Sequence, residues 1–152
     1  MDATHDPAER HPIAYWLKLV GSMVQQNVDT VLGSAAITRR HWQILEFLHE
    51  KSATYAEIDD EAAPFLAPHM PTVRPIVDDL CSRDWATQVS SDRVTLTEIG
   101  TKAHADVAAR LAASREHITA GIDTNDYDVA VDVLRRMAVN LGWSEVKDMG
   151  PV

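Results

Sequence analysis

The sequence predicts a mainly α-helical protein that carries one small β-hairpin, and two observations support this fold class. Apolar residues make up 45% of the chain but aromatic residues only 6%, and alanine is common while glycine is scarce, which favours helices over a sandwich. Residues 72–82 indicate a short amphipathic helix, followed by two brief strands, 86–89 and 94–97, about the polar turn 90–93. A helix followed by a β-hairpin is the arrangement found in a winged helix. We therefore expect a winged helix-turn-helix with N- and C-terminal dimerisation helices.

The expected organisation is one folding unit with appended elements. At 152 residues the chain can bury a real core, yet it is small enough that dimerisation would add much of the stability. We expect a flexible N-terminus at 1–11, dimerisation helices at 12–33 and 98–142, a winged-helix unit at 37–97 and a tail at 143–152.

The first element is a long amphipathic helix from Pro12 to Leu32. Pro12 suits a first helical turn, and Gly33 suits a C-terminal cap. Because this helix precedes the compact part, its apolar stripe must be buried against the same chain or a second copy. The stripe, spaced at three and four residues, comprises Ile13, Trp16, Leu17, Val20, Met23, Val24, Val28, Val31 and Leu32.

A second helix is predicted at residues 39–50, with Thr38 as its N-cap. Arg39, Arg40 and His41 lie in its first turn, where basic residues oppose the helix macrodipole. This unfavourable electrostatic interaction has two explanations. Either these basic residues have a function, or the start of the helix is simply exposed to solvent.

The third helix opens at the capping-box pattern from Thr54 to Glu57. Pro64 should either end this helix or start a further turn. A stiff corner with two prolines, residues 63–68, then leads to the next helix.

The helix before the hairpin should run from Val73 to Ser82. Pro75 cannot donate a backbone hydrogen bond, so it belongs in the first turn, which makes Thr72 the expected N-cap. The apolar positions pack inward and leave a polar face outward. The inward set is Val73, Ile76, Val77 and Leu80, and the outward set is Thr72, Arg74, Asp78 and Asp79.

Two long helices follow the hairpin. Thr97 caps a helix from Glu98 to about Ala120, Gly121 breaks it, and Asp123 or Thr124 starts the last helix. The long helices share apolar faces too extensive for one small core, so an intertwined homodimer is expected. The stripe of the first of these two helices is Ile99, Ala103, Val107, Leu111 and Ile118.

Composition excludes several classes of protein. A formal charge of -9 argues against non-specific coating of nucleic acid, so a DNA-binding surface would have to be a local basic patch. Cys81 is the only cysteine, so no internal disulfide can form. No apolar run approaches the ~18 residues of a membrane helix, and the start lacks a secretory pattern. We expect a cytoplasmic protein with no membrane partner.

The sequence indicates no enzyme. No nucleophile, base and orienting acid stand together, and there is no glycine-rich phosphate loop. No His-x-x-His or cysteine cluster is present, so we expect no catalytic residues, no metal site and no cofactor. Cys81 follows Leu80 near the end of a packed helix, and its expected role is that of a small buried residue.

Several sequence features together resemble the MarR family of winged-helix transcription regulators. They are the order of elements, the string PTVRPIVDDL at 71–80, the pair Asp92-Arg93, the junction LTEIG at 96–100 and the segment VLRRMAVNL at 133–141. The resemblance covers roughly residues 12–142. It implies a homodimer whose winged-helix units each contact half of an inverted repeat in double-stranded DNA, and it makes 37–97 the DNA-binding unit.

The resemblance also implies residue roles. The helix at 72–82 would enter the major groove with Thr72 and Arg74, and Arg93 of the wing would reach the minor groove, which suits an arginine. The remaining members of the predicted DNA-binding set are Arg39, Arg40 and His69. The alternative for Arg74 is an ion pair with Asp78 at i+4.

An effector pocket is a further implication of the resemblance. The family often binds small aromatic or lipophilic molecules, and an aromatic-rich cleft would hold one here. The alternative is that these aromatic residues are simply core. The predicted lining is Tyr15, Trp16, Trp42 and Tyr55.

Two functions therefore compete. The first is a homodimeric MarR-type regulator, a repressor released when a small ligand changes the spacing of its two groove helices. The second is a winged-helix dimer that binds a protein partner through its acidic face. The second is favoured by residues 52–96, where three basic residues stand against eight acidic ones.

Overall fold

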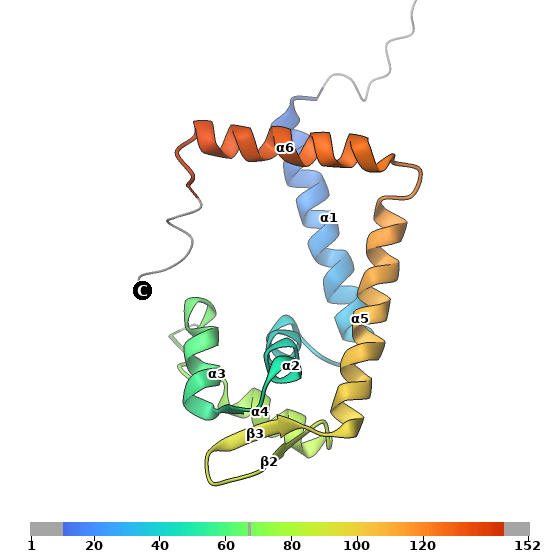
Figure 1. The fold of residues 1–152 in the computed structure, drawn as a ribbon. Coiled ribbons are helices and arrows are strands. Elements are labelled where there is room, and N and C mark those ends of the chain that lie inside the picture. The colour runs from blue at the N-terminus through green and yellow to red at the C-terminus, as the bar shows by residue number, and fades with distance from the viewer. Residues whose placement is uncertain (1–10, 67, 145–152) are drawn as a thin grey trace, which may run out of the picture. The chain divides into compact units, whose positions relative to one another are not determined.

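A computed structural model describes residues 11–66 and 68–144 (Figure 1). The chain divides into two compact units, residues 1–115 and residues 116–152, and each is described by itself. The expected flexible segment 1–11 and tail 143–152 lie outside the described residues except for His11, Trp143 and Ser144.

The first helix, α1, spans Ile13–Ser34 and confirms the predicted long helix. The predicted cap at Gly33 is wrong, because Gly33 lies inside the last turn and the left-handed position is taken by Ala36, with φ +56°. The N–H of Ile37 donates to Leu32 O at 3.1 Å, and the N–H of Ala36 donates to Gly33 O at 2.9 Å. This pair of bonds is a Schellman motif, and Leu32 and Ile37 are both buried beside it.

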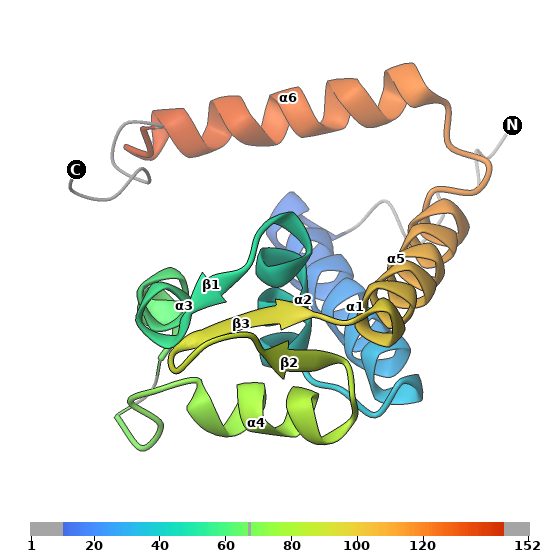
Figure 2. The ribbon, with the colours of Figure 1, turned by 60° about the horizontal axis from the view of Figure 1, so that its bottom comes forward.

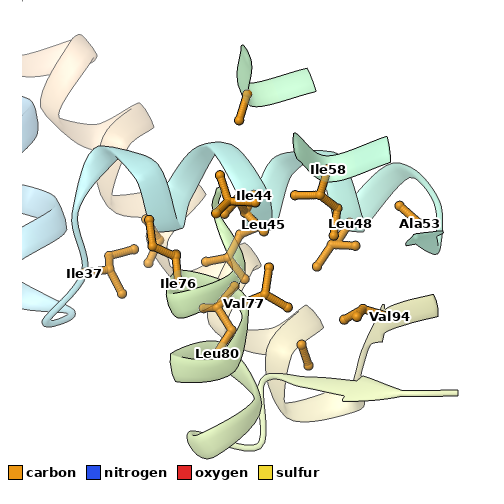
Figure 3. Close-up of a cluster of buried hydrophobic side chains, with 14 of the residues drawn as sticks. Ile37, Ile44, Leu45, Leu48, Ala53, Ile58, Ile76, Val77, Leu80 and Val94 are labelled. Carbon is orange, nitrogen blue, oxygen red and sulfur yellow. The ribbon is translucent and has the colours of Figure 1, made fainter. Parts of the chain in front are cut away.

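The core of the first unit lies between α2 (Arg39–Glu50), α3 (Tyr55–Ala62) and α4 (Arg74–Ser82). Leu45 of α2 and Val77 and Leu80 of α4 are completely buried, and Figure 3 shows the side chains of these two helices meeting. Pro64 does start a further turn, the 3-10 helix η2 (Ala63–Phe65). The helix predicted at 39–50 is confirmed, and the third helix begins at the predicted capping box of Thr54 and Glu57.

The sheet has three antiparallel strands in the order β1-β3-β2, where a two-stranded hairpin was expected (Figure 2). Strands β2 (Ala86–Gln88) and β3 (Arg93–Leu96) form the predicted wing. The missed strand, β1 (Ala53–Thr54), has only two residues, so it carries no readable alternation. Its partners on β3 are Val94 for Ala53 and Arg93 for Thr54.

The helix after the sheet, α5 (Glu98–Ile118), starts at the predicted Thr97, whose Oγ1 accepts from the N–H of Gly100 at 3.0 Å. Within this chain the two ends of the predicted stripe are uncovered, because Ile99 is 56% exposed and Ile118 is 38% exposed. The buried positions of α5 are Gly100, His104, Val107 and Leu111. Gly100 is among them because it lies directly against the backbone of Trp85.

In the second unit, α6 (Thr124–Asn140) starts at Asp123, whose carboxylate accepts from the N–H of Asn125 at 2.8 Å, as predicted. No residue of α6 is buried within the chain. The N-terminal half of α1 is similarly uncovered. Among the described residues, no helix combines the length and apolar character needed to cross a membrane.

Candidate nucleic-acid interface

The outward face of α4 begins at Arg74. Its side chain is exposed, and its guanidinium carbon lies 4.4 Å above the centre of the Tyr55 ring, a cation–π contact. The alternative ion pair with Asp78 is not formed, because the described ion pairs include none between these two residues. Burial and the charge of Asp78 raise the pKa of Tyr55, so its ring remains neutral under Arg74.

The start of α4 is held by a carboxylate from α3. Asp59 Oδ1 accepts from the N–H of Val73 at 2.8 Å, and Thr72 Oγ1 donates to the same carboxylate at 2.9 Å. The helix begins at Arg74 with Val73 as N-cap, so the expected cap at Thr72 is one residue off. Thr72 still accepts from the N–H of Arg74, at 3.2 Å. Thr72 therefore positions the helix start while its side chain stays half-buried.

Arg93 lies in β3 and not in the turn where the sequence placed it. Its Nη1 donates to the carbonyl of Ser52 at 3.1 Å and lies 3.9 Å from Glu57 Oε2. The pKa of Glu57 is lowered, first by the hydrogen bond from the Thr54 N–H and further by the nearby Arg93. The side chain of Arg93 is 40% exposed, so it remains partly open to solvent although its guanidinium is bound to the Ser52 carbonyl.

The two arginines at the start of α2 are also engaged. Arg39 binds Asp29 of α1 through Nε at 2.6 Å and Nη2 at 3.0 Å, and Nη2 donates to Gln25 O at 3.0 Å. Arg40 lies over the Phe65 ring with its guanidinium carbon 5.7 Å from the ring centre. Arg39 thus ties α2 to α1, while Arg40 covers the 3-10 turn.

His41 differs from the expectation of a cation in the first turn of α2. Its Nδ1 accepts from the N–H of Thr38 at 3.2 Å, and its Nε2 lies 3.0 Å from Asp79 Oδ2 on α4. Burial lowers the pKa of His41 and outweighs the opposing effect of Asp79. The residue is therefore a neutral cap that joins α2 to α4. His69, the last member of the predicted set, is exposed in the segment before α4.

The four predicted effector residues lie at three different places in the described part of the chain. Trp42 lines a hollow of about 250 Å³ with Gln25, Val28, Leu32 and Arg39. Tyr15 and Trp16 contact each other edge to face, with ring centres 5.2 Å apart. Twelve residues of helix separate Trp16 from Val28, about 18 Å along the axis of α1. Tyr55 instead lies under Arg74.

Sequence reasoning missed the polar pairs that join the helices. His104 of α5 is buried, its Nε2 lies 2.6 Å from Glu46 Oε1 of α2, and its ring stacks on Trp42 at 5.0 Å and His49 at 4.0 Å. The available signal in the sequence was a histidine at an inward-facing position of a helix. Its partner, Glu46, is 58 residues away, so the sequence around His104 did not point to it.

The residues that the structure describes contain no group of three or more His, Cys, Asp or Glu side chains able to hold a metal ion. Cys81 is half-buried, and burial followed by the charge of Asp78 raises the pKa of its thiol. A thiol held in its protonated form is a weak nucleophile. Cys81 packs against the core, but it is only partly buried where a buried residue was expected.

No family model matches the sequence, and no curated protein matches it. Solved structures do match the fold. MepR, a transcription regulator of the Staphylococcus aureus multidrug efflux pump MepA, has a TM-score of 0.70 at 16% identity, over 86% of this chain and 99% of that chain. The MarR family protein Rv2887 of Mycobacterium tuberculosis has a TM-score of 0.65 at 19% identity, over 91% and 99%.

A third structure is CouR from Rhodococcus jostii RHA1 bound to p-coumaroyl-CoA. Its TM-score is 0.59 at 23% identity, over 88% of this chain and 96% of that chain. At these identities the likeness concerns the fold. The chain has the winged-helix fold of the MarR-type transcription regulators, with a three-stranded sheet whose β2–β3 hairpin is the wing.

Proposed function

We propose that this chain is a homodimeric, MarR-type DNA-binding transcriptional regulator that represses its target by binding an inverted repeat. The observation that carries the proposal is the fold, which extends over most of the chain and nearly all of each regulator compared with it. We infer that a regulator of this kind works in the cytoplasm, where it has access to DNA.

In this proposal α4 enters the major groove with its first turn foremost. Arg74 is exposed there, and an arginine suits bidentate contact with a guanine edge. The Asp59 carboxylate supports this role because it holds the helix start in place from α3. Arg93 on the wing strand supplies the second contact, and it would exchange its Glu57 neighbour for the minor groove or a phosphate.

Uncovered apolar side chains support the dimer. On α1, Leu17 is 44% and Val20 50% exposed, and on α6, Tyr127 is 50% and Val131 48% exposed. Apolar surface on this scale is typical of an interface between subunits. A second copy would cover it and hold two α4 helices about one DNA turn apart, ~34 Å.

The hollow beside Trp42 supports an effector site. Its walls come from α1 and α2, the two helices that Arg39 and Asp29 join, so a ligand there would act on the spacing of the two α4 helices. CouR, which shares this fold, is bound to p-coumaroyl-CoA, a ligand that contains an aromatic group. We propose a small aromatic or lipophilic effector that releases the DNA.

Fluorescence anisotropy with duplex DNA from upstream of the protein's own gene tests the proposal. We expect a specific, salt-sensitive complex, with Arg74→Ala and Arg93→Ala each losing about 1 to 3 kcal/mol of binding free energy. Lys18→Ala removes the same charge from α1 and should keep the affinity of the parent protein. Absence of any sequence-specific complex would contradict the proposal.

The alternative function, a winged-helix dimer for a protein partner, is favoured by one observation. Arg83 and Arg93, two of the three basic residues at 52–96, already lie beside carboxylates of the same chain. The arginine variants separate the two functions, because a protein-binding acidic face would keep its partner when Arg74 and Arg93 become alanine.

A further inference from the structure

The contact that Arg74 makes differs from those of its neighbours in the winged-helix unit. Arg39, Arg83 and Arg93 each donate to a carboxylate or a backbone carbonyl of the chain. In the described part of the chain the Arg74 guanidinium has no such acceptor, and it lies instead over the Tyr55 ring, 4.4 Å from the ring centre. A contact with the face of a ring uses none of the N–H donors of a guanidinium. Arg74 is therefore held by the chain while its donors stay uncommitted.

Tyr55 is fixed by two other parts of the same unit. It is the first residue of α3, directly after the N-cap Thr54, and its own N–H donates to the carbonyl of Asp92 in the turn of the wing at 3.1 Å. Its side chain is half-buried and packs against the hydrophobic core. The ring is thus a fixed support that connects α3 and the wing to the first turn of α4.

Without this ring, Arg74 has a competing partner on its own helix. Asp78 lies one turn further along α4, and oppositely charged side chains at i and i+4 commonly pair on a helix surface. Both side chains are exposed, yet the described ion pairs include none between them. The charges of Arg74 and Asp78 both act on Tyr55, so its ring lies near the face of α4 that carries these two residues.

We propose that Tyr55 is a positioning residue for base recognition, whose ring holds Arg74 apart from Asp78 with its N–H groups free for a base edge. Bidentate contact with guanine needs a planar guanidinium with two free donors side by side, which an ion pair to Asp78 would occupy. Tyr55 acts through Arg74 and needs no contact with DNA of its own. This role on DNA rests on the proposed function, whereas the hold of the ring on Arg74 belongs to the free chain.

A double-mutant cycle on DNA affinity tests the role of the ring. Tyr55→Leu removes the ring but keeps an apolar side chain, and its Kd for the specific site should rise about threefold, which is the order of a cation–π contact at an exposed site. In the Arg74→Ala background the same change should leave the Kd unaltered, because no guanidinium remains to be positioned. Tyr55→Phe keeps the ring and should retain the Kd of the parent protein.

Single-base variants of the DNA site separate positioning from a general structural role. Arg74→Ala and Tyr55→Leu should lose discrimination at the same base pair, because both act on one guanidinium. A general loosening of the fold would instead weaken binding to every site variant by the same factor. Phe47→Leu is the matched control, since it removes a ring that lies under Lys51 of α2's end, with Nζ 5.0 Å from the ring centre, and it should leave base preference unchanged.

NMR of the free protein tests the contact without DNA. In the wild type the Arg74 Nε–Hε group should be ordered and show a nuclear Overhauser effect to the Tyr55 ring. Both signals should persist in Tyr55→Phe and disappear in Tyr55→Leu. The wild-type spectrum needs no variant, and if Tyr55→Leu does not fold, Tyr55→Met replaces it, because methionine fills irregular space without a ring.

Two results would overturn the proposal. One is a Tyr55→Leu effect on the Kd that is equal with and without Arg74, and the other is a mobile Arg74 side chain in the wild type with no contact to the ring. If the chain binds no specific DNA, the proposed function fails and base recognition fails with it, while the NMR comparison still decides whether Tyr55 holds Arg74.

Discussion

Gly100 lies so close to Trp85 that a Cβ at position 100 would be 1.8 Å from the Trp85 carbonyl oxygen. The same carbonyl accepts from the N–H of Thr97 at 3.0 Å, so it cannot move away without breaking this backbone hydrogen bond just before α5. This contact fixes which face of α5 packs on the wing.

Gly100→Ala should therefore destabilise the protein although alanine is the better helix former. Overpacking of this kind costs about 1 to 3 kcal/mol, which outweighs the helix propensity gained. Gly33→Ala is the matched control, since a Cβ there meets no atom within 4 Å and should stabilise α1. Urea unfolding of both variants measures the difference, and equal stabilities would contradict the close contact.

Ala36→Gly should stabilise the protein. Ala36 has φ +56°, a left-handed conformation that costs an L-residue about 1 to 2 kcal/mol and glycine little. Part of this gain is offset by the greater freedom of glycine in the unfolded chain, so we expect a net gain of about 0.5 to 1 kcal/mol. Ala35→Gly, at φ -98°, should give no gain. Thermal unfolding distinguishes the two variants.

Asp59→Ala should weaken the start of α4 specifically. The N–H of Val73 and the hydroxyl of Thr72 would lose their shared acceptor, at a cost of about 1 to 2 kcal/mol for a lost helix cap. Hydrogen exchange at the Val73 amide should accelerate, and Asp60→Ala, an exposed neighbour, should leave it unchanged. An unchanged Val73 amide in Asp59→Ala would show that the cap contributes nothing.

Acid should remove a contribution from Glu57. Its pKa is lowered in the folded state, chiefly by the Thr54 N–H, so its stabilising effect is present above its ordinary pKa of 4.5 and is lost as pH falls through the lower folded value. Glu57→Gln should flatten this part of the curve of Tm against pH. Glu61→Gln should preserve it, and a flattening in both variants would refute a specific role for Glu57.

Val131→Glu should separate the proposed dimer into monomers. Val131 of α6 is 48% exposed within the chain, so a carboxylate there would be buried without a partner at the proposed interface. Arg136→Glu places the same side chain about 140° around the helix from Val131 and should leave the dimer intact. Light scattering measures both masses, and a dimeric Val131→Glu would place the interface elsewhere.

Much of the fold was predictable because its signals are local. Thr54, Thr97 and Asp123 each cap a helix with their own side chain, within three residues of the N–H that they bind. The spacing of apolar residues predicted every long helix, and two short strand patterns about a polar turn predicted the hairpin. Strand β1 escaped prediction because its two residues become a strand only by pairing with β3.

The sequence by itself determined where α3, α5 and α6 begin, the wing, and the position of Arg74 in the first turn of α4, because caps and periodicity depend on neighbours along the chain. Only the tertiary structure decided which polar groups are already engaged. His41 contacts Asp79, which is 38 residues away in the sequence. Arg93 contacts the Ser52 carbonyl, 41 residues away, and His104 contacts Glu46, 58 residues away. Such pairs form when packing brings distant segments together, so the local pattern of residues does not predict them.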